Sequence, residues 1–201
     1  MKERIVKILH NLIRKGMRPD GKTNGNKFDS GMLHASAQVQ TDTDEQGKSA
    51  AQVLDRKNFE RIVVESLKKQ ETGWLLVCDV DRCREINDIY GRDIGDNVLR
   101  YVACVLCDVF TECDCIGSLG GDTFALWLHG IPCDSESDLR MQVGIVNDRL
   151  LHPVRELPPV TVSVGVSYSK AEDDFKSLEK RVNKALYKVK ESGRCGCEIV
   201  L

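Results

Sequence analysis

The 201-residue sequence predicts an α+β domain, because helical and strand patterns follow one another without an internal repeat. Two observations carry most of this prediction. The continuous apolar run Trp74–Cys78 is typical of a fully buried central strand. The Gly120-Gly121 pair lies between two strand-like runs and is typical of a β-hairpin, because glycine reaches positive φ without steric cost. We therefore expect one antiparallel or mixed sheet, covered by helices on one face.

The first 50 residues are predicted to lie outside this domain. Apolar residues at helical spacing predict a short amphipathic helix within residues 1–16. Such a helix needs a partner surface, which could be its own domain or a second subunit. A membrane surface is the least favoured option, because the helix is short. Residues 17–50 are polar and poor in large apolar side chains, so we expect a linker or mobile arm. The folded domain is then expected over residues 51–201.

Within the domain, each element follows from its hydrophobic period. Ser135 is a candidate capping residue, Gly193 a helix stop, and the alternation in 160–166 predicts a strand with one packed face. In chain order, we expect a helix over 54–69, a strand over 74–78, a helix over 96–110, a hairpin within 115–128, a helix over 135–151, a strand over 160–166, a helix over 175–190 and a strand over 198–201.

Composition excludes several function classes. Charged residues make up 30% of the chain and the net charge is −2, which gives no broad electrostatic reason to expect nucleic-acid or membrane binding. No apolar run approaches the length of a membrane span, and the N-terminus lacks the apolar core of a signal peptide. The expected location is therefore cytoplasmic.

The chain contains nine cysteines, an odd number, and disulfides are not expected in a reducing compartment. Two C-x-C pairs, Cys113/Cys115 and Cys195/Cys197, could together supply four thiolates for a structural zinc ion. C-x-C is a weaker signal than C-x-x-C, and nothing in the sequence brings the two pairs together, so scattered thiols are the favoured interpretation and zinc the less favoured one.

An acidic segment, Asp79-Val80-Asp81, closes the predicted central strand. Two carboxylates two positions apart on an extended chain point to the same side. Together with Asp122 at the hairpin they could hold Mg²⁺, which favours carboxylate oxygens and substrate phosphates. The same pattern also suits ordinary acids at a strand end, so this segment alone leaves both interpretations open.

The longer stretch DVDRCREINDIYGRDIGDNVL (Asp79–Leu99) resembles the GGDEF domain, the catalytic module of diguanylate cyclases. Gly120-Gly121-Asp122-Thr123-Phe124 stands where the family has its GG[DE]EF signature. Further similarity lies in TVSVGVS (Thr161–Ser167) and ALYKVKESGR (Ala185–Arg194), so that the resemblance covers about residues 54–201. The positions that match the first motif in register are Asp79, Asp81, Ile86, Asn87, Asp88, Gly91, Gly95, Asp96 and Leu99.

The resemblance implies a palm-like fold of the ferredoxin-like, nucleotide-cyclase type that binds GTP with Mg²⁺ or Mn²⁺. Two such domains, each holding one GTP, would face each other as a homodimer and form cyclic di-GMP. In this reaction a 3′-hydroxyl attacks an α-phosphate and pyrophosphate leaves. The metal polarises the phosphate and lowers the pKa of the hydroxyl.

Position by position, the resemblance also implies roles for individual residues. Asp79 and Asp122 would be catalytic metal ligands, with the Val80 carbonyl beside them. Asn87 and Asp96 would contact guanine, whose ring N–H and exocyclic amine suit a carboxylate acceptor; adenine does not offer this pair, so selectivity follows. The remaining expected nucleotide-binding residues are Arg84, which replaces the family's usual Lys, and Lys190 and Arg194, one helical turn apart, which would bind the β- and γ-phosphates.

The sequence also departs from the family pattern. The signature Glu, which helps to coordinate the metal, is Thr123 here, and a neutral hydroxyl is a poor substitute. Asp81 or water could fill that gap. The usual Arg before Gly-Gly is Ser118, and Arg82 and Cys83 replace the usual aromatic residues.

Two further motifs are changed. The family's entry motif is largely lost in 48–56, although Arg56 and Phe59 fit its end. The inhibitory R-x-x-D motif would fall on 111–114 but lacks its Arg, so feedback inhibition by that route is not expected.

Three interpretations follow. The first is a diguanylate cyclase with an altered metal site. The second is a catalytically weak or inactive GGDEF-like domain that binds GTP or a related nucleotide and acts through a protein partner, with the helix in 1–16 as a candidate contact. The third is a purely structural module, which would have no need of Asn87, Asp96, Lys190 and Arg194 together.

Overall fold

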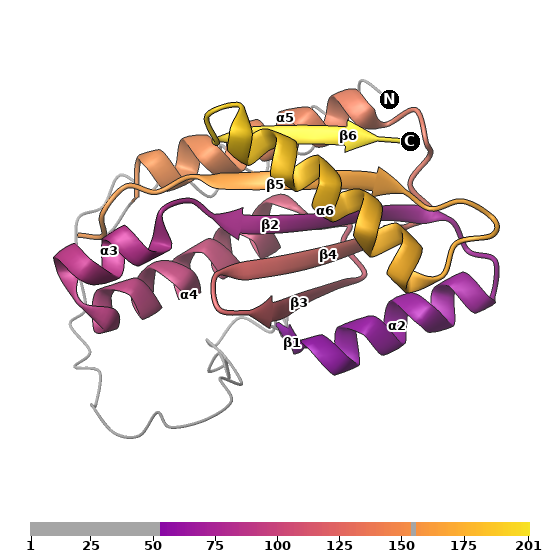
Figure 1. Cartoon of the computed structure of the whole chain (residues 1–201), viewed down its shortest axis with the longest axis horizontal. Coiled ribbons are helices and arrows are strands. Elements are labelled where there is room, and N and C mark those ends of the chain that lie inside the picture. Colours follow the sequence, from indigo (N-terminus) through magenta and orange to yellow (C-terminus); the bar gives the residue numbers. More distant parts are fainter. Residues whose placement is uncertain (1–52, 154–155) are drawn as a thin grey trace, which may run out of the picture. The chain divides into compact units, whose positions relative to one another are not determined.

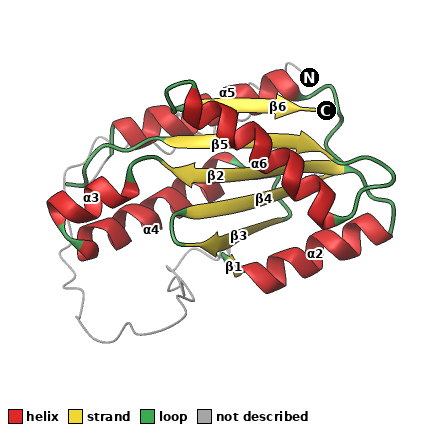
Figure 2. Cartoon of the chain, viewed as in Figure 1, coloured by secondary structure: helices red, strands yellow, loops and turns green. Residues whose placement is uncertain are grey.

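The computed structural model describes residues 53–153 and 156–201, so the predicted helix in 1–16 and linker over 17–50 lie outside the described residues. Strands and helices are interspersed along this part of the chain (Figures 1 and 2). The strands are β1 (Leu54–Asp55), β2 (Gly73–Val80), β3 (Cys115–Gly120), β4 (Thr123–His129), β5 (Val162–Tyr168) and β6 (Gly196–Val200). The helices are α2 (Arg56–Lys68), α3 (Cys83–Tyr90), α4 (Arg92–Val109), α5 (Glu136–Leu151) and α6 (Phe175–Glu191).

The strands form one mixed sheet in the order β1-β3-β4-β2-β5-β6. The centre is antiparallel, because β2 pairs with both β4 and β5 in opposite directions. The outer pairs, β1 with β3 and β5 with β6, are parallel. The predicted α+β class and the hairpin are therefore confirmed, with the hairpin formed by β3 and β4.

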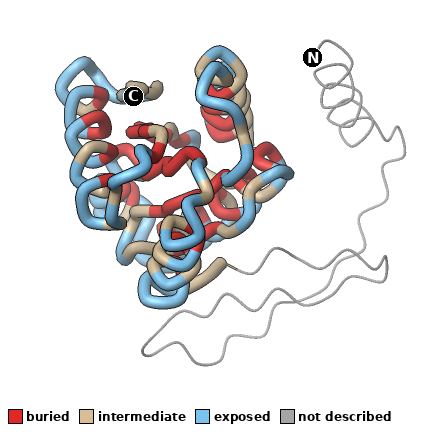
Figure 3. The backbone as a smooth tube through the Cα atoms, turned by 90° about the vertical axis from the view of Figure 1, so that its right-hand side faces the viewer, coloured by how far each residue is buried: buried red, intermediate tan, exposed pale blue. Residues whose placement is uncertain are grey.

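Helices cover both faces of the sheet rather than the single face that we expected. α2 and α6 pack on one face through Phe59, Val63 and Leu178 among others. α3, α4 and α5 contribute to the core on the other face; α4 and α5 run behind the sheet in Figure 1, and α3 lies at its left end. Buried residues are concentrated between these layers (Figure 3). The two-sided cover explains the continuous apolar run in β2, because Leu75 and Val77 face one helical layer while neighbouring residues face the other.

The same cover corrects the prediction for the strand after α5. Positions 162–167 of β5 are all buried, so β5 has two packed faces and not one. Ser163 and Ser167 alternate with apolar residues, and this pattern is the one expected for a strand with one face in solvent. A polar side chain can be buried when it is hydrogen-bonded, as Ser163 is to Asp81.

The sequence did not predict α3. This helix has eight residues, of which only Cys83 and Ile86 are buried. Two buried positions are too few to produce a recognisable helical period in the sequence. The predicted helix over 96–110 begins earlier, at Arg92. Ser135 does occupy the N-cap of α5, but its side chain makes no capping hydrogen bond.

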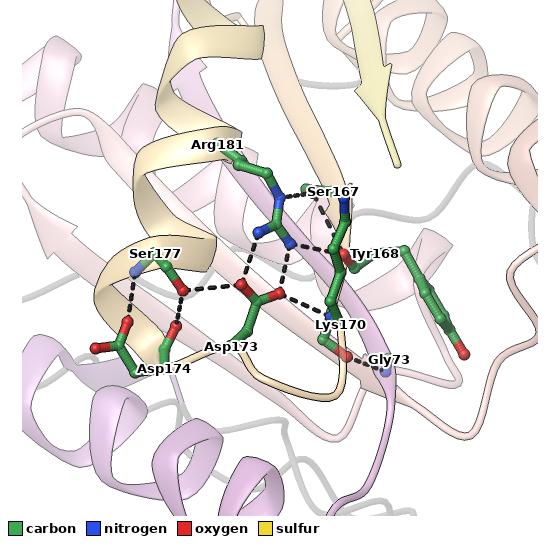
Figure 4. A network of polar contacts seen from close by, with 9 residues as sticks. Gly73, Ser167, Tyr168, Lys170, Asp173, Asp174, Ser177 and Arg181 are labelled. Carbon is green, nitrogen blue, oxygen red and sulfur yellow. Dashed lines mark hydrogen bonds and ion pairs between the residues drawn. The ribbon is translucent and has the colours of Figure 1, made fainter.

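Two polar contacts fix helices to β5. The Asn147 side chain on α5 accepts a hydrogen bond from the Val162 N–H (2.8 Å) and donates one to the Val162 carbonyl (3.2 Å). At the other end of β5, Arg181 on α6 makes a two-pronged ion pair with Asp173 and donates to the Tyr168 carbonyl (Figure 4). Among the described residues, no helix combines the length and apolar character needed to cross a membrane.

Candidate active site

The first part of the candidate site lies where β2 ends beside the hairpin. Antiparallel pairing sets Asp79 opposite Thr123, and the Thr123 hydroxyl donates a hydrogen bond to Asp79 Oδ2 (3.3 Å). One residue further along, the Val80 N–H donates to the Asp122 carbonyl (3.0 Å). The three predicted metal-site residues, Asp79, Val80 and Asp122, are therefore brought together beside Thr123.

The signature turn itself takes a conformation that needs glycine. Gly120 and Gly121 have φ values of 118° and 59°, in the region that side chains disfavour. Gly120 pairs with Thr123 and closes the turn around Gly121 and Asp122. Phe124 points into the core and is 5% exposed, which anchors the start of β4 beneath the turn.

The end of α6 brings a cation to the same place. Lys190 Nζ lies 2.8 Å from Asp79 Oδ1, so both Asp79 oxygens have a partner within the chain. Arg194 follows in the turn between α6 and β6, with Nε 3.9 Å from Asp81 Oδ1. The two predicted phosphate-binding cations thus lie beside the two acids of the Asp79-Val80-Asp81 segment.

Asp81 does not fill the gap left by Thr123. Its carboxylate accepts hydrogen bonds from Thr161 Oγ1 (2.7 Å), Ser163 Oγ (2.7 Å) and the Cys195 N–H (3.2 Å). Both oxygens are therefore engaged by β5, the residue before it and the turn after α6. The interpretation in which Asp81 supplies the missing ligand does not fit this arrangement.

The remaining predicted residues lie on α3 and α4. Asn87 packs against Gly95 so closely that a Cβ added at Gly95 would lie 1.8 Å from Asn87 Oδ1. Gly95 thus lets α3 and α4 meet with Asn87 and Asp96 near their crossing. Arg84 is exposed on the first turn of α3.

The Cys83 thiol shows that the acids of the two regions share one neighbourhood. Burial raises the pKa of Cys83, and the negative charges of Asp122, Asp79 and Asp96 raise it further. Cys83 opens α3, directly after the end of β2. The expected metal-binding carboxylates and the expected guanine-binding carboxylate therefore all lie near this thiol.

The metal-binding chemistry fits a hard divalent cation in kind, although one carboxylate is missing. The oxygen donors available are Asp79, Asp122, the Val80 carbonyl and the Thr123 hydroxyl, and oxygen ligands suit Mg²⁺. The described residues contain no group of three or more His, Cys, Asp or Glu side chains able to hold a metal ion. A carboxylate at position 123, where the resemblance expects the signature Glu, would bring a third acid to Asp79 and Asp122.

A zinc site shared by the two C-x-C pairs is excluded by the sheet. Cys115 begins β3 and Cys197 lies in β6, and three strands separate β3 from β6. At the usual strand spacing the two strands are about 19 Å apart, far beyond the reach of a shared zinc ion. Burial raises the pKa of Cys115 to about 12, which disfavours the thiolate that zinc needs.

This arrangement of strand end, glycine turn and helix crossing is that of a known family. The family model for the diguanylate cyclase GGDEF domain matches residues 48–195, and the chain belongs to that family. The relatives include the diguanylate cyclase DgcM of Escherichia coli K12, which is 32% identical over 146 residues, 71% of this chain and 35% of DgcM. The response regulator PleD of Caulobacter vibrioides is 35% identical over 127 residues, 59% of this chain and 27% of PleD.

The chain thus spans about a third of the length of the relatives that it matches. Solved structures agree on the fold. The GGDEF domain of DgcB from Caulobacter crescentus, in complex with c-di-GMP, superposes with a TM-score of 0.64 at 25% identity, covering 80% of this chain and 98% of that one. The diguanylate cyclase SiaD of Pseudomonas aeruginosa, in complex with its activator SiaC, gives 0.64 at 28% identity, covering 73% and 58%. The palm-like α+β fold is therefore confirmed.

The sequence missed the residues that surround Asp81. Thr161, Ser163 and Cys195 all donate hydrogen bonds to its carboxylate, yet they lie 80 to 114 positions away along the chain. A signal did exist, because three small polar residues in otherwise buried or turn positions need a polar partner. Nothing in the spacing, however, identified Asp81 as that partner.

Proposed function

We propose that this domain binds GTP with a divalent cation and that its diguanylate cyclase turnover is weakened by Thr123. One observation carries the second half of the proposal. Lys190 and Thr123 engage the two oxygens of Asp79, and no further carboxylate stands at the position of the signature Glu. An active metal site has to bind its cation with the oxygens that this arrangement occupies.

Guanine recognition is assigned to the crossing of α3 and α4. A carboxylate on Asp96 accepts hydrogen bonds from the ring N–H and the exocyclic amine of guanine, and the Asn87 amide adds donors and an acceptor. Adenine lacks that pair of donors and would leave acceptors without a partner, which is the physical basis of selectivity. The packing of Asn87 on Gly95 supports this assignment, because it fixes Asn87 beside Asp96.

The triphosphate is assigned to the cations at the end of α6. Lys190 and Arg194 are four positions apart, and a phosphate chain offers each of them stronger, charge-assisted hydrogen bonds. Arg84 on α3 adds a third cation. Binding requires Lys190 to move from Asp79 Oδ1 to a phosphate oxygen, and this exchange frees the carboxylate for a metal ion.

GGDEF diguanylate cyclases use divalent metal ions, and in this domain Mg²⁺ or Mn²⁺ would be held by Asp79, Asp122 and the Val80 carbonyl. Such an ion polarises the α-phosphate and lowers the pKa of the attacking 3′-hydroxyl. Each domain holds one GTP, so cyclic di-GMP requires a homodimer in which two sites face each other. We expect the domain to act in the cytoplasm, where GTP is supplied.

The test is incubation with GTP and MgCl₂ or MnCl₂, followed by mass spectrometry of the products. We expect little cyclic di-GMP from the wild type and an increase of about tenfold or more in Thr123→Glu, because a metal-binding carboxylate is worth at least that factor. Thr123→Ser keeps the hydroxyl and serves as the control, with no gain expected. Abundant product from the wild type, or no gain in a folded Thr123→Glu, would contradict the proposal.

The second candidate function is a nucleotide-binding module without turnover that acts through a protein partner. The Asp79–Lys190 ion pair favours it, because it neutralises the metal carboxylate within the chain. SiaD in complex with its activator SiaC shows that a GGDEF protein can bind a regulator, and residues 1–16 are our candidate contact here. Calorimetry and product analysis together separate the two candidates. GTP binding with no cyclic di-GMP formed in either MgCl₂ or MnCl₂ would support the module without turnover. If no heat is measured at millimolar GTP, neither candidate holds, and the purely structural module is the remaining interpretation.

A further inference from the structure

Asp81 is a buried carboxylate that joins three separate segments of the chain. Its side chain is only 4% exposed. Oδ1 accepts from Ser163 on β5, and Oδ2 accepts from Thr161 just before β5 and from the backbone N–H of Cys195. A buried carboxylate is costly unless it is hydrogen-bonded, so this set of donors explains why a charge is tolerated here. It also ties the turn after α6 to the end of β2.

That turn has an unusual backbone. Arg194 and Cys195 have φ values of 70° and 53°, and Arg82, which follows Asp81, has 56°. In the described chain, only Gln70 joins these three as a non-glycine residue at positive φ. Each such residue costs about 1 kcal/mol or more, so surrounding contacts have to hold the conformation. Two hydrogen bonds hold this turn: the Arg194 N–H donates to the Val189 carbonyl (3.0 Å), and the Cys195 N–H donates to Asp81 (3.2 Å).

The guanidinium of Arg194 is oriented by the same carboxylate. Its Nε faces Asp81 Oδ1 at 3.9 Å, and the side chain remains 45% exposed. Within the described residues, the two terminal nitrogens have no hydrogen-bond partner. The contact with Asp81 is a long ion pair in which Nε is the nitrogen that faces the carboxylate, and the planar guanidinium then carries its terminal nitrogens on the side away from Asp81. They are then available to a phosphate beside Lys190.

We propose that Asp81 is a positioning residue for the phosphate-binding turn. It holds the backbone of 193–195 and the Nε of Arg194, and it touches neither the nucleotide nor the metal. This inference rests on the proposed GTP site. Loss of the Asp81 charge should therefore weaken binding of the triphosphate but not of guanosine monophosphate, whose recognition depends mainly on Asn87 and Asp96.

The experiment measures dissociation constants for GTP and GMP, with MgCl₂, in four proteins: wild type, Asp81→Asn, Arg194→Ala and the double variant. Asn has the shape of Asp. With its amide nitrogen at the place of Oδ1, the Ser163 hydroxyl reverses its hydrogen bond and becomes the acceptor, while Thr161 and the Cys195 N–H keep an oxygen acceptor, so we expect a folded protein. GTP affinity should fall about tenfold in Asp81→Asn, the equivalent of one charge-assisted hydrogen bond, while GMP affinity stays within about twofold. In the double variant, GTP affinity should equal that of Arg194→Ala, because Asp81 acts through Arg194.

Asp173→Asn is the matched control. Asp173 is a similarly buried carboxylate (5% exposed) paired with an arginine, but it lies at the opposite end of β5. It should lower stability and leave GTP affinity unchanged. If Asp81→Asn does not fold, Thr161→Val removes a single donor to Asp81 and should weaken GTP binding selectively by about threefold.

The outcomes separate the two proposals. Unchanged or raised GTP affinity in folded Asp81→Asn, or in folded Thr161→Val, overturns the positioning role. Equal losses for GTP and GMP, or losses that add in the double variant, overturn it as well. If the wild type itself binds no GTP, the proposed function fails and the positioning role fails with it.

Discussion

Asp79 and Asp81 are two positions apart in one motif, but their surroundings give them different chemistry. Asp79 faces the partly exposed Lys190 side chain and a hydroxyl, partners that a ligand can displace. Asp81 is enclosed by two hydroxyls and a backbone N–H, partners that belong to the fold. The spacing of the motif located both acids correctly but could not distinguish them, because the difference depends on residues more than 40 positions away.

At the same scale, Gly95 tests the guanine site. Gly95→Ala adds a methyl group at the position where Asn87 Oδ1 now lies, so the Asn87 side chain has to leave. We expect GTP affinity to fall about tenfold, the loss of one to two hydrogen bonds, and discrimination against ATP to weaken. Calorimetry with both nucleotides measures this.

Gly144→Ala is the control for that variant. Gly144 lies on α5, and a Cβ there would meet nothing within 4 Å. It should stabilise the protein by about 0.5–1 kcal/mol and leave nucleotide binding unchanged. Equal GTP affinity in Gly95→Ala and Gly144→Ala would argue against a role for Asn87.

At the scale of elements, the junction of β5 and α6 depends on one ion pair. Asp173 and Arg181 meet at 2.6 Å, and Arg181 also donates to Ser167 and to the Tyr168 carbonyl (Figure 4). Asp173→Asn leaves a half-buried guanidinium without its counter-charge. We expect it to lower the free energy of unfolding by about 3 kcal/mol, as when one partner of a buried pair is removed. Urea denaturation at pH 7 measures the difference.

The same pair predicts a pH dependence. The Arg181 guanidinium lowers the pKa of Asp173 from 3.8 to about 2. A lowered pKa stabilises the folded state fully above the unfolded value, and this contribution is lost as the pH falls through the folded value. The difference in stability between the wild type and Asp173→Asn should therefore be constant above about pH 5 and shrink between pH 4 and 2.

Asp174→Asn is the control here. Its exposed carboxylate caps α6 through Ser177, and Asn caps helices equally well. It should change stability far less than Asp173→Asn. A pH-independent difference between the wild type and Asp173→Asn would show that charge is not the source of the stabilisation.

Element types were largely predictable, whereas their environment was not. The central strand, the hairpin and the helices α2, α4, α5 and α6 follow from hydrophobic period, which is a local property. α3 was missed because its stripe has two buried residues. The predictions of a sheet covered on one face and of a half-exposed β5 were wrong for the same reason. The second face of the sheet is buried by α2 and α6, and their packing on it depends on the tertiary fold and not on the local sequence pattern.

At the scale of the whole molecule, the order of the strands decides which residues meet. It brings the end of β2, the start of β4 and the end of α6 together into one candidate site and keeps the two C-x-C pairs apart. Sequence proximity suggested neither result. The family resemblance predicted the shared site, because members of a family have the same strand order. It predicted nothing about the cysteines, because the family pattern does not contain them.

The cysteines also offer a test of whether the sheet unfolds as one unit. Burial strongly raises the pKa of Cys78 on β2 and of Cys113 before β3, so both thiols should resist alkylation in the folded protein. Cys133 and Cys195 are exposed and should react first at pH 7.5.

Pulse labelling with iodoacetamide across a urea series, read by mass spectrometry, follows each thiol. Cys78 and Cys113 pack against the same core, so we expect both to become reactive at one urea midpoint. Earlier labelling of Cys113 would show that the β3–β4 hairpin opens before the central strand, and the candidate site would then be lost before the core.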